Sequence, residues 1–451
     1  MTFEQFLAID MPPLFTALFS GVACALLGNY LLLRRVSMMG DAIAHSVLPG
    51  IVVAFLVTSS RDVGAVFIGA AIAAMLSAVT MEMVRRLGRV ESGAAMGVVF
   101  SIFFAAGVLL LEQAAARSVD LDADCLLHGQ LETIFWFPPV FDQNFFTFET
   151  LMMVPQEVGS SFAVMIVSFV FVLLLYKELK ITAFDSALAA SIGYRPTLMY
   201  YALMIVVAAA VVASFKAVGS ILVISMLICG PAAARMCTDR LIIQLVLSVL
   251  FTILMVCLGY VLGAFMPQWL GYQSSVNIAG SIAVVGGLLV ILMVLTAPRY
   301  GVIAKYIRDF KFSIRVVSED VLAWIYRRSE RNEQTPLTLK EIRSGFKDDF
   351  IFSLALRDLI GRNLIQIPSD KTMRSGGSIT LSDQGNQEAK KLLQAHRLWE
   401  NYLVAEGSFP VDHVHNSAET IEHFTESDLI RKLEQESGFP TKDPHGKDIP
   451  R

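Results

Sequence analysis

Long apolar runs separated by short charged loops dominate the first 298 residues of this 451-residue chain. A helix needs roughly 20 predominantly apolar residues to cross the hydrocarbon core of a bilayer, and nine runs approach that length. They lie at about 13–33, 43–59, 63–84, 93–112, 160–176, 196–214, 217–234, 241–266 and 276–297. Because lipid offers no partner for backbone polar groups, such runs form helices. The sequence therefore predicts a mostly α protein with a polytopic helical membrane domain of about nine spans.

The positive charges between the runs predict the orientation of the chain, because cytoplasmic loops carry an excess of Lys and Arg. With the N-terminus outside, twelve of the Lys and Arg residues up to residue 305 fall in cytoplasmic loops. Only Arg61, Arg117 and Lys216 fall in outer loops. The residues after the last span are therefore predicted to be cytoplasmic. The longest outer loop, about 113–159, is acidic and aromatic, and is either a mobile surface loop or a docking face for an outside partner.

The composition changes after the last span. Residues 316–451 contain 22 Asp and Glu and 18 Lys and Arg, which is typical of a soluble domain. We expect a transmembrane domain at 1–298 and a basic juxtamembrane linker at 299–315. The soluble part is expected to divide into a first half, 316–385, and a second half, 386–451.

Two ionisable residues stand at the start of the second span. Asp41 and His45 are four residues apart, which places both side chains on one face of a helix. Ionisable groups within spans are costly and mark functional sites by default. A carboxylate beside an imidazole suits a borderline divalent cation such as manganese, iron or zinc. Alternatively, Asp41 caps a helix end and His45 is merely packed; the spacing alone leaves both interpretations open.

Four segments of the membrane part carry a family resemblance. They are Leu-Arg-Arg-Val-Ser-Met-Met-Gly-Asp-Ala-Ile-Ala-His-Ser-Val-Leu-Pro-Gly at 33–50, Glu-Ser-Gly-Ala-Ala-Met-Gly at 91–97, Asp-Cys-Leu-Leu-His-Gly at 124–129, and 218–235, which ends in Gly-Pro-Ala-Ala-Ala-Arg. In this order they resemble the ABC-3 permeases of manganese, zinc and iron importers. The resemblance covers about residues 10–298.

This resemblance implies a permease subunit of an ATP-driven metal importer in a bacterial inner membrane. It implies three partners: an ATP-binding subunit, an extracytoplasmic metal-binding protein, and a second permease subunit that is identical or different. Asp41 and His45 match the family's pair in the metal path. The segment 184–194, which contains Asp185 and Gly193, resembles the cytoplasmic coupling helix that seats in the ATPase.

The chain itself has no phosphate-binding loop of the pattern GxxxxGK(S/T). Its one Gly-Lys pair is followed by Asp448. We therefore expect the chain not to be an enzyme and the separate subunit to hydrolyse ATP, and no organic cofactor is expected.

The first half of the soluble part has a helix-turn-helix rhythm. Ser318 is expected to open a helix, Thr338 a second short one, and residues 350–361 a third. A hairpin follows with Gly376-Gly377 at its tip. This order predicts a winged-helix domain.

The second half gathers residues that can bind metal on a helical stretch from 388 to 436. His396 and Glu400 are four residues apart, as are His415 and Glu419. Glu422 and His423 continue the second face, and five of the seven histidines lie beyond residue 395. Imidazole and carboxylate groups on neighbouring helices favour a divalent metal site. The alternative is a solvated charged face.

This soluble part resembles the iron- and manganese-dependent repressors. The resemblance rests on His-Arg-Leu-Trp-Glu at 396–400, Val-His at 414–415, residues 419–423, and Asp-Pro-His-Gly-Lys-Asp-Ile-Pro at 443–450. It implies helical metal-binding and dimerisation functions for 386–451. By position, the manganese-type sensing site corresponds to Asp320, His396, Glu419, Glu422 and His423, and the ancillary site of iron-type members to Glu400 and His415. One ligand position is lost, because Ala323 stands where manganese-type members have Glu.

DNA binding is not expected, because the helix at 350–361 begins with Asp348 and Asp349, which repel phosphate. We therefore favour a metal-ion permease with a cytoplasmic metal-sensing domain, for which the divalent ion is both substrate and regulator. The alternative is a membrane-tethered, metal-dependent transcription regulator, although nine spans are more than an anchor needs. An ion-coupled transporter without ATP is disfavoured because carboxylate pairs are absent from the depth of the spans.

Overall fold

The computed structural model describes residues 6–58, 63–115, 129, 131–136, 154–269, 271, 276–331, 339–346, 348–366, 379–407 and 409–450. Within these ranges, nine helical segments are long and apolar enough to cross a membrane, which confirms the predicted number of spans. Backbone contacts divide the chain into two units, Met1–Ala304 and Lys305–Arg451. The outer-loop motif 124–128 and the hairpin tip Gly376-Gly377 lie outside the described residues.

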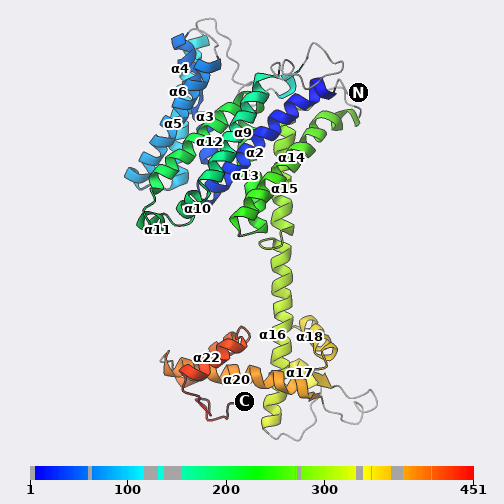
Figure 1. Cartoon of the computed structure of the whole chain (residues 1–451). Coiled ribbons are helices and arrows are strands. Elements are labelled where there is room, and N and C mark those ends of the chain that lie inside the picture. Colours follow the sequence, from blue (N-terminus) through cyan, green and yellow to red (C-terminus); the bar gives the residue numbers. More distant parts are fainter. Residues whose placement is uncertain are drawn as a thin grey trace. The chain divides into compact units, whose positions relative to one another are not determined.

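In the first unit, called the membrane unit below, every element among the described residues is a helix (Figure 1). Its elements are η1 (Phe6–Asp10), α2 (Met11–Leu33), α3 (Met39–Ser46), α4 (Leu48–Thr58), α5 (Val63–Gly88), α6 (Ser92–Ala115), η2 (Leu131–Thr133), α9 (Gln156–Leu174), α10 (Tyr176–Phe184), α11 (Ser186–Ser191), α12 (Pro196–Val218), α13 (Ser220–Cys237), α14 (Leu241–Trp269) and α15 (Ile278–Thr296). The second predicted span is formed by α3 and α4 together, because Val47 between them keeps helical dihedral angles.

Helix α2 is the centre of this unit, and its apolar window is the most buried of the nine. It packs against α9, α12, α13 and α14. A Cβ atom at Gly28 would collide with the carbonyl oxygen of Leu227 in α13, so glycine is required for this close approach. Helices α4, α5 and α6 contact one another and form a second group, joined to the centre through α12 and α3 (Figure 1).

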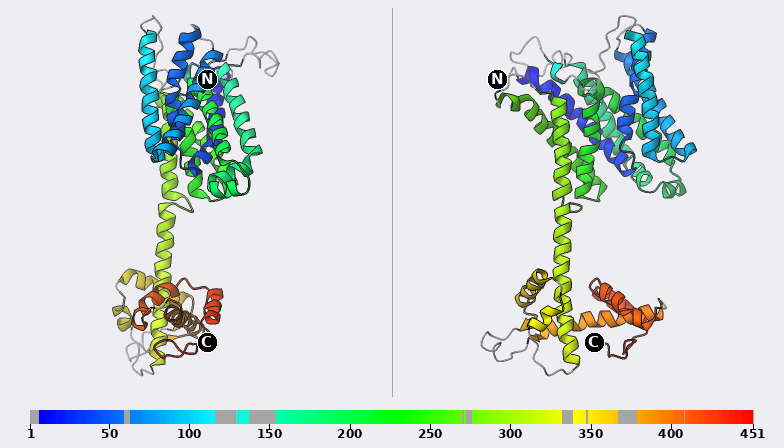
Figure 2. Two further views of the ribbon diagram at one scale, coloured as in Figure 1. Left: turned by 90° about the vertical axis from the view of Figure 1, so that its left-hand side faces the viewer. Right: turned by 180° about the vertical axis from the view of Figure 1, so that it is seen from behind.

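The second unit, called the C-terminal unit below, is mainly helical with one small sheet (Figure 2). Its elements are α16 (Val302–Glu330), α17 (Leu339–Ser344), α18 (Asp349–Gly361), β1 (Ile365–Gln366), β2 (Thr380–Leu381), α20 (Asp383–Ala405), η3 (Val411–His413), α21 (His415–Glu422) and α22 (Ser427–Glu436). The two strands pair antiparallel, with Ile365 opposite Leu381. Three helices followed by a two-stranded sheet are compatible with a winged helix, which stays a prediction.

The first helix of this unit begins earlier than the sequence analysis predicted. It does not open at Ser318; α16 already starts at Val302. The Ser318 hydroxyl donates back to the carbonyl oxygen of Ile314 at 2.9 Å, a bond made inside a helix, and so does not cap a new one. Residues 302–315 contain neither Gly nor Pro, so nothing in them interrupts the helix.

Candidate metal sites and coupling segment

In the membrane unit, Asp41 and His45 face each other across one turn of α3. The distance from His45 Nε2 to Asp41 Oδ1 is 3.2 Å, and their side chains are 20% and 33% exposed for His45 and Asp41 respectively. Neither side chain is therefore completely covered by the rest of the chain. A carboxylate oxygen and an imidazole nitrogen at this separation can serve one divalent cation as neighbouring ligands.

The surroundings of this pair fix the histidine ring. The ring lies against Phe100 and Phe104 of α6, with centroids 5.2 and 5.9 Å away. At the start of α3, a Cβ atom on Gly40 would collide with the side chain of Leu227 in α13. Helix α3 thus sits between α6 and α13, and the His45 ring is held against aromatic side chains of α6.

The segment proposed for ATPase coupling forms a separate short helix. Asp185 is the N-cap of α11, and its Oδ1 accepts hydrogen bonds from the backbone N–H groups of Ala187 and Leu188, both at 2.9 Å. Gly193 follows the helix with φ +96°, in the left-handed region that favours glycine. Leu188 and Ile192 are exposed. The segment is thus a capped turn that presents apolar side chains outward.

The described residues of the C-terminal unit form two clusters that could hold a metal ion. The first, called the His415 cluster, consists of His396 and Glu400 on α20 and His415 at the start of α21. Glu400 Oε1 lies 3.1 Å from His396 Nε2 and 2.9 Å from His415 Nδ1. The two imidazole nitrogens are 3.0 Å apart. His396 and Glu400 are buried and His415 is exposed, so the cluster has one open side.

The second, called the Asp320 cluster, joins α16 to the end of α21. It consists of Asp320, Glu422 and His423. His423 Nε2 lies 3.3 Å from Asp320 Oδ1 and 3.9 Å from Glu422 Oε1. His423 Nδ1 lies 2.7 Å from Glu319 Oε2, and Glu319 in turn accepts a hydrogen bond from Arg315. The ring therefore turns Nε2 toward the two carboxylates, as a ligating histidine does when a carboxylate holds its other nitrogen.

Glu422, a member of the Asp320 cluster, also contacts the His415 cluster. Its Oε2 lies 2.6 Å from Nδ1 of His396, while its Oε1 faces His423. Its side chain is only 2% exposed, so this carboxylate is committed to the two histidines. The two clusters consequently share one buried anionic group.

The carboxylates change the protonation of both clusters. Burial alone would lower the pKa of His423, but hydrogen bonds to Asp320 and Glu319 outweigh it and raise the pKa to about 10. Burial would raise the pKa of Glu400, but hydrogen bonds from His396 and His415 lower it to about 2. The donor set of imidazole and ionised carboxylate fits manganese(II), iron(II) or zinc, once the histidines release protons.

Two of the positions that the sequence analysis identified lie outside both clusters. Glu419 is exposed and belongs to neither cluster. Ala323 is buried against Leu392 and Leu393 of α20. The lost ligand position thus lies in an apolar contact, and Glu319, one turn earlier on α16, supplies the additional carboxylate.

Glu319 and His445 were missed by the sequence analysis. His445 Nε2 lies 3.8 Å from Glu400 Oε1. The Glu319 contact spans 104 residues, and its only sequence signal was its place beside Asp320. His445 could have been found as the one histidine within the 443–450 motif.

The N-terminus of α18, the helix predicted at 350–361, is capped by its own acidic side chains. Asp348 Oδ1 accepts hydrogen bonds from the backbone N–H groups of Phe350 and Ile351 and so occupies the donors of the first turn. Asp349 pairs with Arg343 at 2.6 Å, and this hydrogen bond lowers the pKa of Asp349. Phe350 is exposed beside them. These features disfavour DNA contact by this helix.

Two family profiles match the chain. The profile of the ABC 3 transport family matches residues 9–135 and 142–294, which is more than half of the chain. The profile of the iron dependent repressor, metal binding and dimerisation domain matches residues 382–451. The latter range holds all of the His415 cluster, together with Glu422 and His423.

Individual relatives agree with these matches. The manganese transport system membrane protein MntD of Bacillus subtilis is 39% identical over 293 residues, which are 65% of this chain and 94% of the relative. The zinc transport system membrane protein TroD of Treponema pallidum is 36% identical over 69% of this chain and 80% of the relative. A probable metal transport system membrane protein of Chlamydia trachomatis is 24% identical over 99% of this chain and 96% of the relative, so that match includes the C-terminal unit.

One solved structure supports the fold of the membrane unit. PsaBC from Streptococcus pneumoniae, in complex with Fab, is similar with a TM-score of 0.51 and 26% identity. The similarity covers 64% of this chain and 92% of that chain.

Proposed function

This chain belongs to the ABC 3 transport family, and we propose that it is the membrane-spanning permease subunit of an ATP-driven importer of a divalent transition metal ion. Manganese, zinc and iron are the candidate substrates. The observation that carries the proposal is the family match across the spans, with Asp41 and His45 held together inside it. Uptake of each metal by a strain lacking the gene, in competition with the other two, tests the proposal. Unchanged uptake of all three would contradict it.

The chain works with partners in this proposal. An ATP-binding subunit hydrolyses ATP, because the sequence contains no phosphate-binding loop of its own. An extracytoplasmic metal-binding protein delivers the ion, and a second permease subunit completes the path. The N-terminus lies outside and the C-terminal unit in the cytoplasm, as the distribution of Lys and Arg indicates.

The C-terminal unit acts as a metal-sensing regulator of transport. Its carboxylates and imidazoles join α16, α20 and α21, and a bound divalent ion would supply the positive charge that these groups share. Occupancy can bias transport only if the ion binds one conformation of the unit more tightly than another. When the cytoplasmic metal concentration is sufficient, the ion should occupy this unit and slow further import. A membrane-tethered transcription regulator is the weaker alternative, because the N-terminus of α18 carries Asp348 and Asp349.

Gly193→Val should reduce metal uptake at least tenfold. A β-branched residue at φ +96° strains the turn after α11 by roughly 1–2 kcal/mol, so the segment 184–194 should lose its geometry. The spans themselves should insert normally. Measurements are uptake and co-purification with the ATP-binding subunit.

A matched control is Gly97→Val in α6, where the same side chain meets open space on a helical backbone. Asp185→Ala, which removes both cap hydrogen bonds, should give a smaller defect, because a cap contributes about 1 kcal/mol. If Gly193→Val neither weakens co-purification nor slows uptake, 184–194 is not the contact.

Metal binding by the C-terminal unit should strengthen as pH rises. Protonated His423 must release the proton on Nε2 before that atom can ligate, and its pKa is raised to about 10. Below that pKa, apparent affinity should increase about tenfold per pH unit for each proton released. Calorimetry between about pH 6 and pH 8, in buffers of different ionisation enthalpy, counts the protons. An affinity independent of pH would show that His423 is not a ligand.

A further inference from the structure

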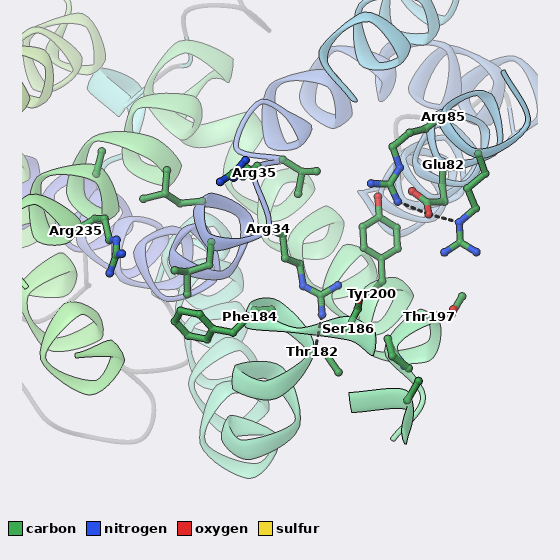
Figure 3. Close-up of a pocket in the computed structure, with 18 residues that line it drawn as sticks. Arg34, Arg35, Glu82, Arg85, Thr182, Phe184, Ser186, Thr197, Tyr200 and Arg235 are labelled. Atoms are coloured by element: carbon green, nitrogen blue, oxygen red, sulfur yellow. Dashed lines mark hydrogen bonds and ion pairs between the residues drawn. The ribbon is translucent and has the colours of Figure 1, made fainter. Parts of the chain in front are cut away.

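A polar cavity of about 1050 Å³ lies in the membrane unit where α2 and α5 end and α10, α11 and α12 meet (Figure 3). These ends are the ones that the Lys and Arg distribution assigns to the cytoplasm. The charged residues that line the cavity are five arginines and a single carboxylate: Arg34, Arg35, Arg85, Arg86, Arg235 and Glu82. The cavity therefore carries an excess of positive charge.

The one carboxylate of the cavity is already used. Arg85 Nη2 and Arg86 Nε both donate to Oε1 of Glu82, at 2.6 and 2.5 Å. Glu82 is buried, and its other oxygen, Oε2, has no hydrogen-bond partner among the described residues, so one carboxylate charge remains beside these two arginines. Arg235 pairs with Asp239 at 3.2 Å. None of the described carboxylates forms an ion pair with Arg34 or Arg35.

Arg34 is the central cation of the cavity. Its Nη2 donates to the Thr182 hydroxyl at 2.8 Å, and its guanidinium lies 5.8 Å from the ring centre of Tyr200. In Figure 3, Arg34 lies beside the Tyr200 ring, Arg85 lies at its hydroxyl end next to Glu82, and Arg235 lies farther off, across the cavity. The Nε atom of Arg34 is buried without a hydrogen-bond partner in the part of the chain that the structure describes. The Arg34 guanidinium thus lies beside a hydroxyl group and an aromatic ring and forms no ion pair with a described carboxylate, so its charge is left for an anion in the cavity.

The backbone beside Arg34 adds a second observation. Helix α2 ends with the bonds Val36 N to Leu31 O and Arg35 N to Leu32 O. This is a Schellman end, in which the position of Arg35 is normally glycine. Arg35 has φ +58° and so adopts the left-handed region at a cost of roughly 1–2 kcal/mol. The chain thus places a further guanidinium, this one exposed, at the cavity where the backbone alone favours glycine.

We propose that this cavity binds a phosphate-bearing anion. Guanidinium groups bind phosphate through paired, charge-assisted hydrogen bonds, and Arg34 and Arg35 line the cavity without forming an ion pair with a described carboxylate. Basic pockets between spans on the cytoplasmic side are places where phospholipid headgroups bind. The same chemistry would accept free phosphate from the cytoplasm, so the experiment must separate these two sources.

A bound phosphate would act on two parts of the proposed transport machinery. Val36 belongs to the loop that leads into α3, the helix of Asp41 and His45. Phe184 and Ser186 belong to the coupling segment. An anion between Arg34 and the other arginines would tie the loop to the coupling segment and would neutralise positive charge at the inner end of a cation path. Anion binding itself does not depend on the proposed function.

The test uses the full chain, purified in neutral detergent without phosphate. It is titrated at constant ionic strength with dioctanoyl phosphatidylglycerol, with inorganic phosphate, or with dioctanoylglycerol, which has the same chains and no phosphate. Binding is followed through the unfolding midpoint. We expect phosphatidylglycerol to raise the midpoint and Arg34→Gln to weaken its binding about tenfold.

Arg35→Gln is the second variant, because its exposed side chain can be replaced without endangering folding. The matched control is Arg240→Gln, an exposed arginine on the same side that does not line the cavity. Equal effects of inorganic phosphate would identify free phosphate as the source. The proposal is overturned if neither phosphate compound raises the midpoint, if dioctanoylglycerol binds as well, or if Arg240→Gln weakens binding as much as Arg34→Gln and Arg35→Gln.

Discussion

Replacing His45 with alanine should abolish metal uptake while leaving expression of the chain and binding of the ATP-binding subunit intact. His45 Nε2 and Asp41 Oδ1 are 3.2 Å apart and partly open to solvent, so together they can replace water around a divalent ion. Without the imidazole, only the carboxylate of Asp41 remains as a ligand of this pair. Lipid offers no replacement ligand for the ion. We expect at least a hundredfold loss of uptake, about 3 kcal/mol in the barrier. Radioactive manganese uptake, repeated with zinc and iron, is the measurement.

Two companion variants distinguish a metal path from a helix cap. Asp41→Asn keeps the shape and much of the capping capacity of the side chain, but it removes the negative charge. The N-cap of α3 is Met38, without a side-chain cap hydrogen bond, so a structural role of Asp41 is limited to the first turn of the helix. If Asp41 has only that role, this variant should transport normally; if it holds the ion, uptake should fall as in His45→Ala. Met38→Ala is the control, because Met38 is an exposed neighbour at the start of the same helix. Normal transport by His45→Ala would show that the pair is structural.

The sequence was sufficient for the parts of this fold that depend on local periodicity. Asp41 and His45 meet because four residues make about one helical turn, whatever surrounds them. The nine spans were predictable for a related reason, since bilayer thickness sets their length. The contact of His396 with Glu400 follows from the same spacing.

Contacts between segments that are distant in the sequence could not be predicted from local sequence patterns. The hydrogen-bond contact of Glu319 with His423 depends on how α16 packs against the end of α21, which no spacing encodes. The start of α16 at Val302 was missed because a serine before an acidic residue looks like a helix cap, whereas Ser318 is bonded inside the helix. The cavity around Arg34 was missed because its arginines, separated by up to 201 positions, had been counted only as a topology signal.

Glu422→Ala should impair metal binding in both clusters of the C-terminal unit, because one buried carboxylate serves both. Its Oε1 faces His423 in the Asp320 cluster, and its Oε2 contacts His396 in the His415 cluster. In the first cluster the variant loses a ligand; in the second it loses the group that orients His396. Loss of an orienting carboxylate typically costs about 10–100-fold in metal affinity, and loss of a ligand should cost at least as much. Calorimetric titration of the full chain with manganese(II) measures this, in a His45→Ala background that removes the membrane pair.

The matched control is Glu436→Ala on α22, which removes the same charge from an exposed position outside both clusters. Glu419→Ala separates two explanations of the site. The repressor resemblance makes Glu419 a ligand, whereas the structure places it outside both clusters, so a loss of affinity would require α21 to turn when metal binds. If Glu422→Ala affects only one binding event, the clusters are independent and the shared carboxylate does not couple them. If it affects neither, these histidines and carboxylates form a structural network, and regulation of transport by metal would need another site.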